Sequence, residues 1–344
     1  MSLDEKRRPT IRVILAAHGE AETAGFLENF LVGWRTLGHA AEVMRLSAPL
    51  RLAICTMHGL RKRLTRQSGS PHNANTRNQA KALELSLASQ NGAQFIVDSA
   101  FASASPSLND QIDKASEFDQ QVVVSLIPSD SRLSCGLFCH ALLEAPKHLQ
   151  QNNVVLSRLW ESSELIDIHC AHIEARCPPV ESGGPSCLLL VLHGTLVRDQ
   201  QGQKPHFHTG EAEKTFYGQA LRAALMSQPE KRWDRIEIAF LNHGVGGQWS
   251  APTLDETLSR LEKEGVNHLV AYACEHLVDG SETAQLAARL NQSAIAQTHC
   301  LPSLNSDPDL IDFLAKRLQS ALQQPRTAMC CDPCPLVTDS AATV

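Results

Sequence analysis

Several features are missing from this 344-residue sequence, and each absence excludes a class of protein. No apolar run reaches the roughly 18 residues that span a bilayer, so we expect no transmembrane helix. The formal net charge is -6, and without a basic excess we expect no nucleic-acid partner. The opening MSLDEKRRPT is charged and holds no apolar segment, so we expect no signal peptide and predict a cytoplasmic protein.

Common catalytic motifs are also missing. Neither GxGxxG nor GxxxxGK[ST] occurs, which removes the main support for a dinucleotide or P-loop site. GxSxG is absent, so the HGVGG segment at residues 243–247 does not indicate a serine hydrolase, and HExxH is absent too. Aromatic residues are scarce at 5%, whereas the chain has 15 histidines and 11 cysteines. Imidazoles and thiols are therefore the side chains to examine for chemistry.

The cysteines are not arranged like a disulfide framework. In a chain without an expected export signal, reduced thiols or a metal site are the better interpretation. The tail holds Cys330, Cys331 and Cys334, and the Cys331-x2-Cys334 spacing with Pro335 after it is typical of metal or iron–sulfur sites. A loose tail with free thiols is the alternative. A fourth ligand would come from mid-chain, where the available thiols are Cys135, Cys139, Cys170 and Cys177.

Short β-branched runs alternate with longer helical patterns along the chain. Several of these runs are apolar on both faces, as buried parallel strands are. The alternation predicts an α/β fold with mostly parallel sheets flanked by helices. The predicted strands are residues 11–16, 42–46, 94–98, 121–127, 188–192, 235–241, 268–273 and 294–298. The predicted helices are residues 21–37, 75–87, 108–117, 136–149, 210–226, 254–263, 282–290 and 308–322.

The chain has two similar halves. Proline and glycine cluster between Cys177 and Pro185, which predicts a boundary there. On each side a strand leads directly into a His-Gly pair: VILAAHGE reaches His18, and LLLVLHGT reaches His193. We predict a duplicated α/β unit, with domains at residues 1–180 and 185–322 and a Cys-rich extension at 323–344. Because ligands bind beyond the carboxyl ends of strands in such sheets, both histidines are expected at a ligand site.

Two positions have a plain structural interpretation beside a functional one. His193 could cap a loop, or its neutral ring could act as a base or metal ligand near pH 7. Asp279 and Glu282 precede a predicted helix, where Asp279 as N-cap and Glu282 three residues later would form a capping box. Alternatively, Glu282 projects into the crevice as a functional carboxylate. The residues alone leave both questions open.

Many segments, in collinear order over nearly the whole chain, resemble the ferrochelatase family. The segment LAAHGEAETAGFLENFL is similar to the family's opening strand–NLG–PET–FL segment, and GSPHNANTRNQAKAL is similar to its GSP…T…QA…L stretch. LSRLWESSELIDIHCAHI resembles W…I…A-H-I, and LVLHGT resembles the strand and histidine of F-S-x-H-G-x-P. AFLNHGVGGQWSAPTLDETL resembles SFQSR-x-G…W-x-x-P…DETL, and ACEHLVDGSETAQ resembles F-x-S-D-H-x-E-T-L.

This resemblance implies a fold and an activity. It implies two Rossmann-like, chelatase-type domains and a lyase that inserts Fe(II), its metal substrate, into protoporphyrin IX or coproporphyrin in haem biosynthesis. His193 falls on the family's metal-binding histidine and Glu282 on its paired carboxylate, so the catalytic and metal-binding pair is expected at these positions. The porphyrin is the expected partner. Because it is lipophilic, peripheral membrane association is left open, although no amphipathic anchor is evident in the sequence.

The sequence also departs from the family pattern. An Arg-Tyr pair of the family is replaced by Ala102-Ser103, and the histidine of S-D-H-x-E-T is replaced by Gly280. Some family members carry a [2Fe–2S] cluster, with three tail ligands and one mid-chain ligand. Cys330, Cys331 and Cys334 resemble the tail set. Cys135 lies near the mid-chain position, so these four are the expected cluster ligands.

Two other functions compete with this prediction. One is a sirohydrochlorin-type cobalt or iron chelatase, because the small chelatases of that group use two histidines and His18 ends the first predicted strand. The other is a non-catalytic homologue that binds a tetrapyrrole or a metal, which the loss of Arg-Tyr at Ala102-Ser103 favours. A measurement of metal preference would distinguish the sirohydrochlorin-type chelatase from a ferrochelatase. Tight binding of a tetrapyrrole without turnover would indicate the non-catalytic homologue.

Overall fold

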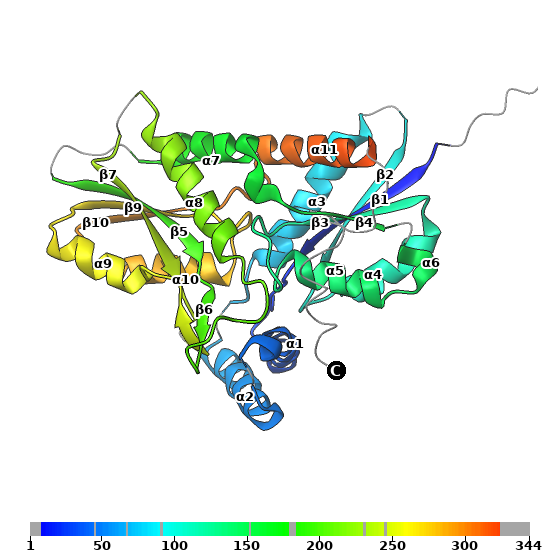
Figure 1. Cartoon of the computed structure of the whole chain (residues 1–344), viewed down its shortest axis with the longest axis horizontal. Helices are drawn as coiled ribbons and strands as arrows, with labels where there is room; N and C mark the ends of the chain where they lie inside the picture. The colour runs from blue at the N-terminus through cyan, green and yellow to red at the C-terminus, as the bar shows by residue number, and fades with distance from the viewer. Residues whose placement is uncertain are drawn as a thin grey trace, which may run out of the picture.

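Two parallel sheets of four strands each form the framework of the protein (Figure 1). The computed structural model describes residues 8–323, except 45, 67, 90–91, 151–152, 179–183, 230–231 and 244–245. The strand orders are β2-β1-β3-β4 in the first sheet and β10-β9-β5-β7 in the second. All strand pairs within these two sheets are parallel, and helices cover both faces. The predicted α/β class is confirmed.

The first sheet places alternate side chains of each strand against different helices, because successive residues of a strand point to opposite faces. Val13 and Leu15 of β1 belong to one apolar cluster, with α3, whereas Ile14 and Ala16 belong to another, with α4 and α5. The elements of this half are β1 (Thr10–Ala17), α1 (Phe26–Met44), α2 (Ala48–Thr65), α3 (His72–Ala88), β2 (Gln94–Phe101), α4 (Leu108–Ile112), the 3-10 turn η1 (Asp113–Glu117), β3 (Gln120–Ser125), α5 (Cys135–Glu144), α6 (Lys147–Gln150), β4 (Asn153–Leu156), η2 (Leu159–Glu161) and α7 (Ser163–Arg176).

The second sheet repeats this logic. Leu188, Leu190 and Leu192 of β5 face the same cluster as Val13, and Leu189 and Val191 face α9 and α10. The elements are β5 (Ser186–His193), β6 (Leu196–Asp199), α8 (Glu211–Met226), β7 (Arg235–Leu241), β8 (Gly247–Trp249), α9 (Leu254–Lys263), β9 (His268–Ala273), α10 (Ser281–Leu290), β10 (Gln297–Leu301) and α11 (Pro308–Gln323).

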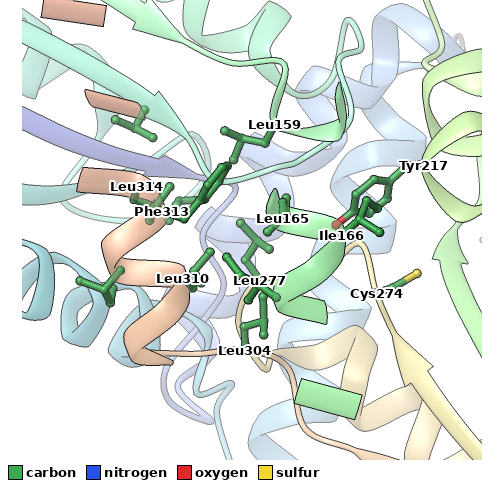
Figure 2. Packing of buried hydrophobic residues seen from close by; sticks show 14 of the residues in the cluster. Leu159, Leu165, Ile166, Tyr217, Cys274, Leu277, Leu304, Leu310, Phe313 and Leu314 are labelled. Carbon is green, nitrogen blue, oxygen red and sulfur yellow. The ribbon is translucent and has the colours of Figure 1, made fainter. Parts of the chain in front are cut away.

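The two sheets share one hydrophobic core. The cluster that covers one face of β1 and β3 continues without a break to β5 and β9 through α7, α8 and α11. The last helix, α11, crosses to the first half and packs against α3 and α7. Figure 2 shows Leu310, Phe313 and Leu314 of α11 close to Leu165 of α7 and to Leu277. The relative position of the two sheets is therefore set by buried apolar contacts.

Helices α1 and α2 pack against each other and extend from the first sheet toward one side of the molecule (Figure 1). Their outer surfaces expose large apolar side chains: Leu27, Leu31, Leu50, Leu52, Ile54, Met57, Leu60 and Leu64. The antiparallel pair β6–β8 extends from the second sheet toward the same side. Residues of both arms, among them Ile54 of α2 and Trp249 of β8, line the main cleft.

Candidate active site

A cleft of about 1040 Å³ lies between the two halves. It begins where β1 and β5 end, so His18 and His193 both line it, as predicted from the two His-Gly pairs. The glycine after each histidine has a steric reason. Gly19 has φ +79°, and a Cβ there would lie 2.5 Å from Cβ of Phe101; a Cβ on Gly194 would clash with the side chain of Asn242.

Strand register brings three functional side chains to the wall formed by the second sheet. His193 ends β5 and is paired with Leu241 of β7, while Val191 is paired with Ala273 of β9. Side chains two residues apart along a strand lie on the same face of the sheet. The residues two places after Leu241 and Ala273 are therefore on the face of the sheet that carries the His193 side chain. These residues are His243 and Glu275.

Three potential metal ligands come together at this wall. Nε2 of His193 lies 3.2 Å from Oε1 of Glu282 and 3.0 Å from Nε2 of His243. Nε2 of His243 lies 3.5 Å from the same carboxylate oxygen. All three donor atoms lie within 4.8 Å of one another, and no other group of three or more His, Cys, Asp or Glu side chains meets this criterion in the described part of the chain. Two imidazoles and a carboxylate form a donor set suited to a divalent transition metal.

The charge of Glu282 is kept by its neighbours. Burial alone would raise the pKa of this carboxyl, but His193 and His276 hold it well below the usual value. Nε2 of His276 lies 3.0 Å from Oε2, the carboxylate oxygen that faces away from the metal-ligand group. Burial lowers the pKa of His276, but the hydrogen bond and the charge of Glu282 outweigh burial and raise it above the ordinary value. His276 therefore orients the carboxylate and balances its charge.

The predicted capping box at Asp279 is wrong by one residue. Helix α10 begins at Ser281 with Gly280 as its N-cap, and Thr283 Oγ1 accepts the Gly280 N–H at 2.9 Å. The Asp279 carboxylate instead accepts the N–H of Ser303 at 2.9 Å and the side-chain amide of Asn305 at 2.7 Å. Glu282 lies at the second position of the helix, so it is free of the capping role and points to the histidines.

A buried ion pair holds the main chain of His193. Glu275 Oε2 accepts the His193 N–H at 3.0 Å, and Lys214 Nζ donates to the His193 carbonyl at 3.2 Å. The Lys214 ammonium and the Glu275 carboxylate lie 3.4 Å apart, and their side chains are 9% and 2% exposed. Ser129, from the first half, also donates a hydrogen bond to Glu275. Both polar groups of the His193 backbone are thereby fixed.

The segment from Glu275 to Ser281 is held by the first half at alternate residues. Besides Ser129 on Glu275, Gln79 Nε2 donates to the carbonyl of Leu277 at 3.2 Å, and Asn75 Nδ2 donates to that of Asp279 at 3.3 Å. Glu20 then accepts the Ser281 N–H at 2.9 Å and its hydroxyl at 2.7 Å. The side chains of one half thus position the segment that carries His276 and leads to Glu282.

His18 lies across the cleft and interacts electrostatically with His193 and Glu282. Burial is the main reason that its pKa falls to about 3, and the charge that His193 can carry lowers it further. His18 is therefore neutral at physiological pH. His72, at the start of α3, lines the same wall.

The family model described as ferrochelatase matches residues 11–322. The chain belongs to the ferrochelatase family. The ferrochelatase of Acidobacterium capsulatum is 27% identical over 343 residues, covering 91% of this chain and 94% of that protein. An Escherichia coli ferrochelatase is 26% identical over 262 residues, covering 72% and 76%, and one from Neisseria meningitidis is 25% identical over 264 residues, covering 72% of each.

A solved structure from Deinococcus radiodurans was also found, described as a multi-domain protein with structural similarity to chelatases and two additional novel domains. It is 15% identical with a TM-score of 0.42, and the match covers 93% of this family member and 56% of that chain.

The departures from the ferrochelatase pattern do not all lie at the cleft. Ala102 and Ser103 are not among the residues that line it, whereas Gly280 is. An imidazole is nevertheless present beside the carboxylate, because His276, four residues before Gly280, contacts Glu282. His276 lies outside the S-D-H-x-E-T pattern, six residues before Glu282, so the motif gives no indication of its role.

Only one of the four predicted cluster ligands lies within the described residues of this ferrochelatase-family chain. Cys330, Cys331 and Cys334 lie outside the described residues. Cys135 is the first residue of α5 and is 1% exposed, in the apolar cluster with Ile14 and Phe138. A thiol enclosed in this apolar core does not fit the role of a cluster ligand.

Sequence reasoning missed four residues of this site: His243, His276, Lys214 and Glu275. His243 was noticed only as part of HGVGG. A usable indication was available, because His243 and Glu275 follow two predicted strands that flank the strand of His193. The register that aligns them required the structure.

Proposed function

We propose that this family member is an active ferrochelatase, which inserts Fe(II) into protoporphyrin IX or coproporphyrin for haem biosynthesis. The observation that carries the proposal is the pair His193 and Glu282, 3.2 Å apart on the wall of a cleft of about 1040 Å³. The ferrochelatase family membership of the chain supports the same activity. A cleft of this size is at the upper end of the range for small-molecule sites, as a tetrapyrrole requires.

Metal insertion needs a ligand pair that binds Fe(II) and then releases it. Glu282, whose pKa is held low, presents a full negative charge at neutral pH, and His193 offers an imidazole nitrogen beside it. Mixed nitrogen and oxygen ligands suit Fe(II), while the thiolates that would retain it are absent from the metal-ligand group. The pair therefore suits delivery of the metal rather than permanent storage.

Insertion also requires two pyrrole N–H protons to leave. A proton acceptor must lie at the face of the ring, within hydrogen-bond reach. His193 is placed for this role, and the pair Glu282–His276 behind it, 3.0 Å apart, can receive and pass on the proton. Binding that favours a bent macrocycle would lower the barrier further, because the bent ring resembles the transition state.

The lining of the cleft favours a porphyrin over a more acidic ring. Lys62 and Lys214 are the lysines or arginines that line it among the described residues, and Lys214 is paired with Glu275. A sirohydrochlorin-like ring carries many carboxylates, which this lining leaves largely uncompensated. Apolar side chains suited to a porphyrin include Val32, Leu37, Ile54, Ile127, Leu196, Phe207 and Trp249.

We also propose that α2 docks on an anionic membrane. No helix among residues 8–323, as far as they are described, could cross a bilayer. On helix α2, the side chains of Met57 and Leu64 are 70% and 80% exposed. The helix also carries Arg51, Arg61, Lys62 and Arg63, and it contains no acidic residue. Apolar side chains beside cations favour the interface of anionic lipid. Ile54 and Lys62 of the same helix line the cleft, so a lipophilic porphyrin could enter from the membrane.

Vesicle sedimentation tests this docking. The protein should sediment with vesicles that contain phosphatidylglycerol, less with phosphatidylcholine alone, and less at high salt, since surface charge attraction is screened. The variant Met57→Glu/Leu64→Glu should lose binding, and Leu85→Glu, an exposed leucine on α3, should keep it. Equal binding of all three proteins would refute the docking surface.

An anaerobic metallation assay tests the activity. Fe(II) or Zn(II) and protoporphyrin IX, coproporphyrin or sirohydrochlorin are followed by visible absorption. His193→Ala and Glu282→Gln should abolish turnover of a porphyrin, and His299→Ala, on the exposed face of β10, should retain it. Full activity of His193→Ala would refute the assigned pair. Turnover of sirohydrochlorin alone would establish the competing chelatase, and tight porphyrin binding without turnover would establish a carrier.

A further inference from the structure

We propose that His243 is a third metal ligand beside His193 and Glu282, and that this three-donor set binds a divalent transition metal before a tetrapyrrole enters. The inference deepens the proposed function and rests on it for its biological meaning. It concerns the order of substrate binding and the choice of metal. The sequence resemblance aligns His243 with the arginine of the family's SFQSR segment, and an arginine cannot ligate a cation.

The distances between the donor atoms fit one shared ion. Ligand nitrogens and oxygens lie about 2.0–2.2 Å from a transition metal. Two ligands of one ion are therefore about 3.0 Å apart at a right angle and about 3.4 Å apart at a tetrahedral angle. The three separations here are 3.0 Å, 3.2 Å and 3.5 Å. Each edge of the triangle has the length that a coordination shell requires.

The orientation of the two imidazole rings also supports a shared metal ion. His193 and His243 present Nε2 to each other and to the same oxygen of Glu282. When each ring carries its proton on Nδ1, three lone pairs converge on one point, and a cation satisfies all of them together. Three protein ligands leave coordination positions open, which the pyrrole nitrogens of an incoming ring can take.

His243 is held in place by contacts of its own strand end. The preceding residue, Asn242, donates its side-chain amide to the carbonyl of Ser250 at 2.8 Å. The ring of His243 packs edge-on against Trp249, with the ring centres 5.6 Å apart. Both contacts come from the segment that follows β7, so the ligand position does not depend on a bound tetrapyrrole.

The proposal has a consequence for metal selectivity. A two-histidine, one-carboxylate site should bind Co(II) and Ni(II) more tightly than Fe(II), because the affinity of such a site rises from Fe(II) through Co(II) to Ni(II). In the absence of a tetrapyrrole, these metals should occupy the site and compete with iron. Removing His243 should relieve that competition.

Direct metal binding tests the proposal without any porphyrin. The full chain is treated with a chelator and titrated anaerobically with Co(II), read by its visible absorption bands and by calorimetry. Wild type should bind one equivalent, and His243→Arg and His243→Ala should bind it at least about tenfold more weakly, since even residues behind a metal ligand contribute 10–100-fold. The matched control is His140→Asn, which removes the His140–Glu144 pair on α5. Thermal melting verifies that each variant is folded.

The outcomes separate this proposal from the proposed function. Equal Co(II) affinity of wild type and His243→Arg would overturn the third ligand. Metallation of a porphyrin by a wild-type protein that binds no Co(II) on its own would also overturn it, while the chelatase function would stand. Conversely, Co(II) binding that is lost in His243→Arg, with no metallation by wild type, would support the site and refute the chelatase.

Discussion

Lys214 and Glu275 illustrate how single residues shape this site from behind. Neither is a metal ligand in the proposed mechanism, yet together they hold the N–H and the carbonyl of His193. A buried ion pair contributes little net stability, because desolvation of the two charges offsets their attraction. The role of the Lys214–Glu275 pair is better explained by the fixed position that it gives to the His193 backbone.

We predict that Lys214→Met destabilises the protein by about 3–5 kcal/mol, because Glu275 is left as a buried charge without its cation. The double variant Lys214→Met/Glu275→Gln should recover most of that loss in urea unfolding, since both charges are gone. Its turnover should stay roughly 10–100-fold below wild type, because His193 has lost its supports. Normal turnover in the stable double variant would reduce the pair to a purely structural role.

A second buried network involves the two tyrosines of the chain. His169 is bonded through Nε2 to the Tyr217 hydroxyl at 2.5 Å and through Nδ1 to that of Tyr272 at 2.6 Å. Burial lowers the pKa of His169 to about 3. Between pH 6.5 and 3, unfolded His169 therefore binds a proton that folded His169 does not, so acid favours unfolding.

We predict that His169 lowers the free energy of unfolding as the pH falls. From pH 7 to pH 5 its contribution to the free energy of unfolding should fall by about 2 kcal/mol, at about 1.4 kcal/mol per pH unit below 6.5. His169→Leu should be less stable at pH 7 but should lose less stability on acidification, measured by urea unfolding at both pH values. His299→Asn is the control. An unchanged acid slope in His169→Leu would contradict the prediction.

At the scale of elements, helix α10 depends on a residue from the other half of the chain. Glu20, just after β1, accepts both the N–H and the hydroxyl of Ser281 at its first turn. A carboxylate is favourable at a helix N-terminus, where N–H groups lack partners within the helix. The contact ties the helix that carries Glu282 to the opposite wall of the cleft.

We predict that Glu20→Ala costs about 1 kcal/mol of stability, as loss of a helix cap does, and lowers turnover by about tenfold because Glu282 loses its position. Thr253→Ala is the matched control. It removes the capping box of α9, in which Thr253 and Glu256 bond reciprocally, and neither residue lines the cleft. Its stability loss should be similar and its turnover normal. Equal turnover in the two variants would refute the coupling.

The sequence predicts best the helices and strands that have one apolar and one polar face, or whose ends are marked by turn residues. The predicted bounds of β7, β9 and α9 match the structure, because each is a buried run or an amphipathic stretch between turns. Helix α7 lies outside the predicted helices because its buried face carries His169 and His172 among apolar residues, which weakens the apolar pattern at helical spacing. Residues 42–46 were predicted as a strand, yet α1 continues to Met44, and α2, which exposes many leucines, was not predicted.

For the candidate site, local pattern and family resemblance pointed to His18, His193 and Glu282, which the structure places at the cleft. They could not identify His243 and His276, whose roles depend on register between strands and on how residues 274–280 fold before α10. The capping interpretation of Asp279 failed for the same reason. A one-residue difference in where a helix begins decides whether a carboxylate caps the helix or faces the cleft.

The whole molecule is joined by the apolar cluster that both sheets share. We predict that the two halves unfold in one transition, because neither can expose this surface alone without a large cost in free energy. Far-UV circular dichroism and tryptophan fluorescence should give coincident urea curves, with tryptophans in both halves reporting. Phe313→Ala should shift both curves together and cost about 3–5 kcal/mol. Two separate transitions would show that the halves are independent.

The crossing of α11 to the first half matters during synthesis of the chain. The sheet formed by β1 to β4 and the helix α3 leave the ribosome long before residues 308–323, which cover them. Until that helix emerges, the apolar cluster to which Leu83 and Leu87 of α3 belong lacks the side chains of α11, and nascent chains with exposed apolar surface tend to aggregate. The N-terminal half should therefore complete its fold only after residues 308–323 have emerged, and chains truncated before residue 308 should be insoluble.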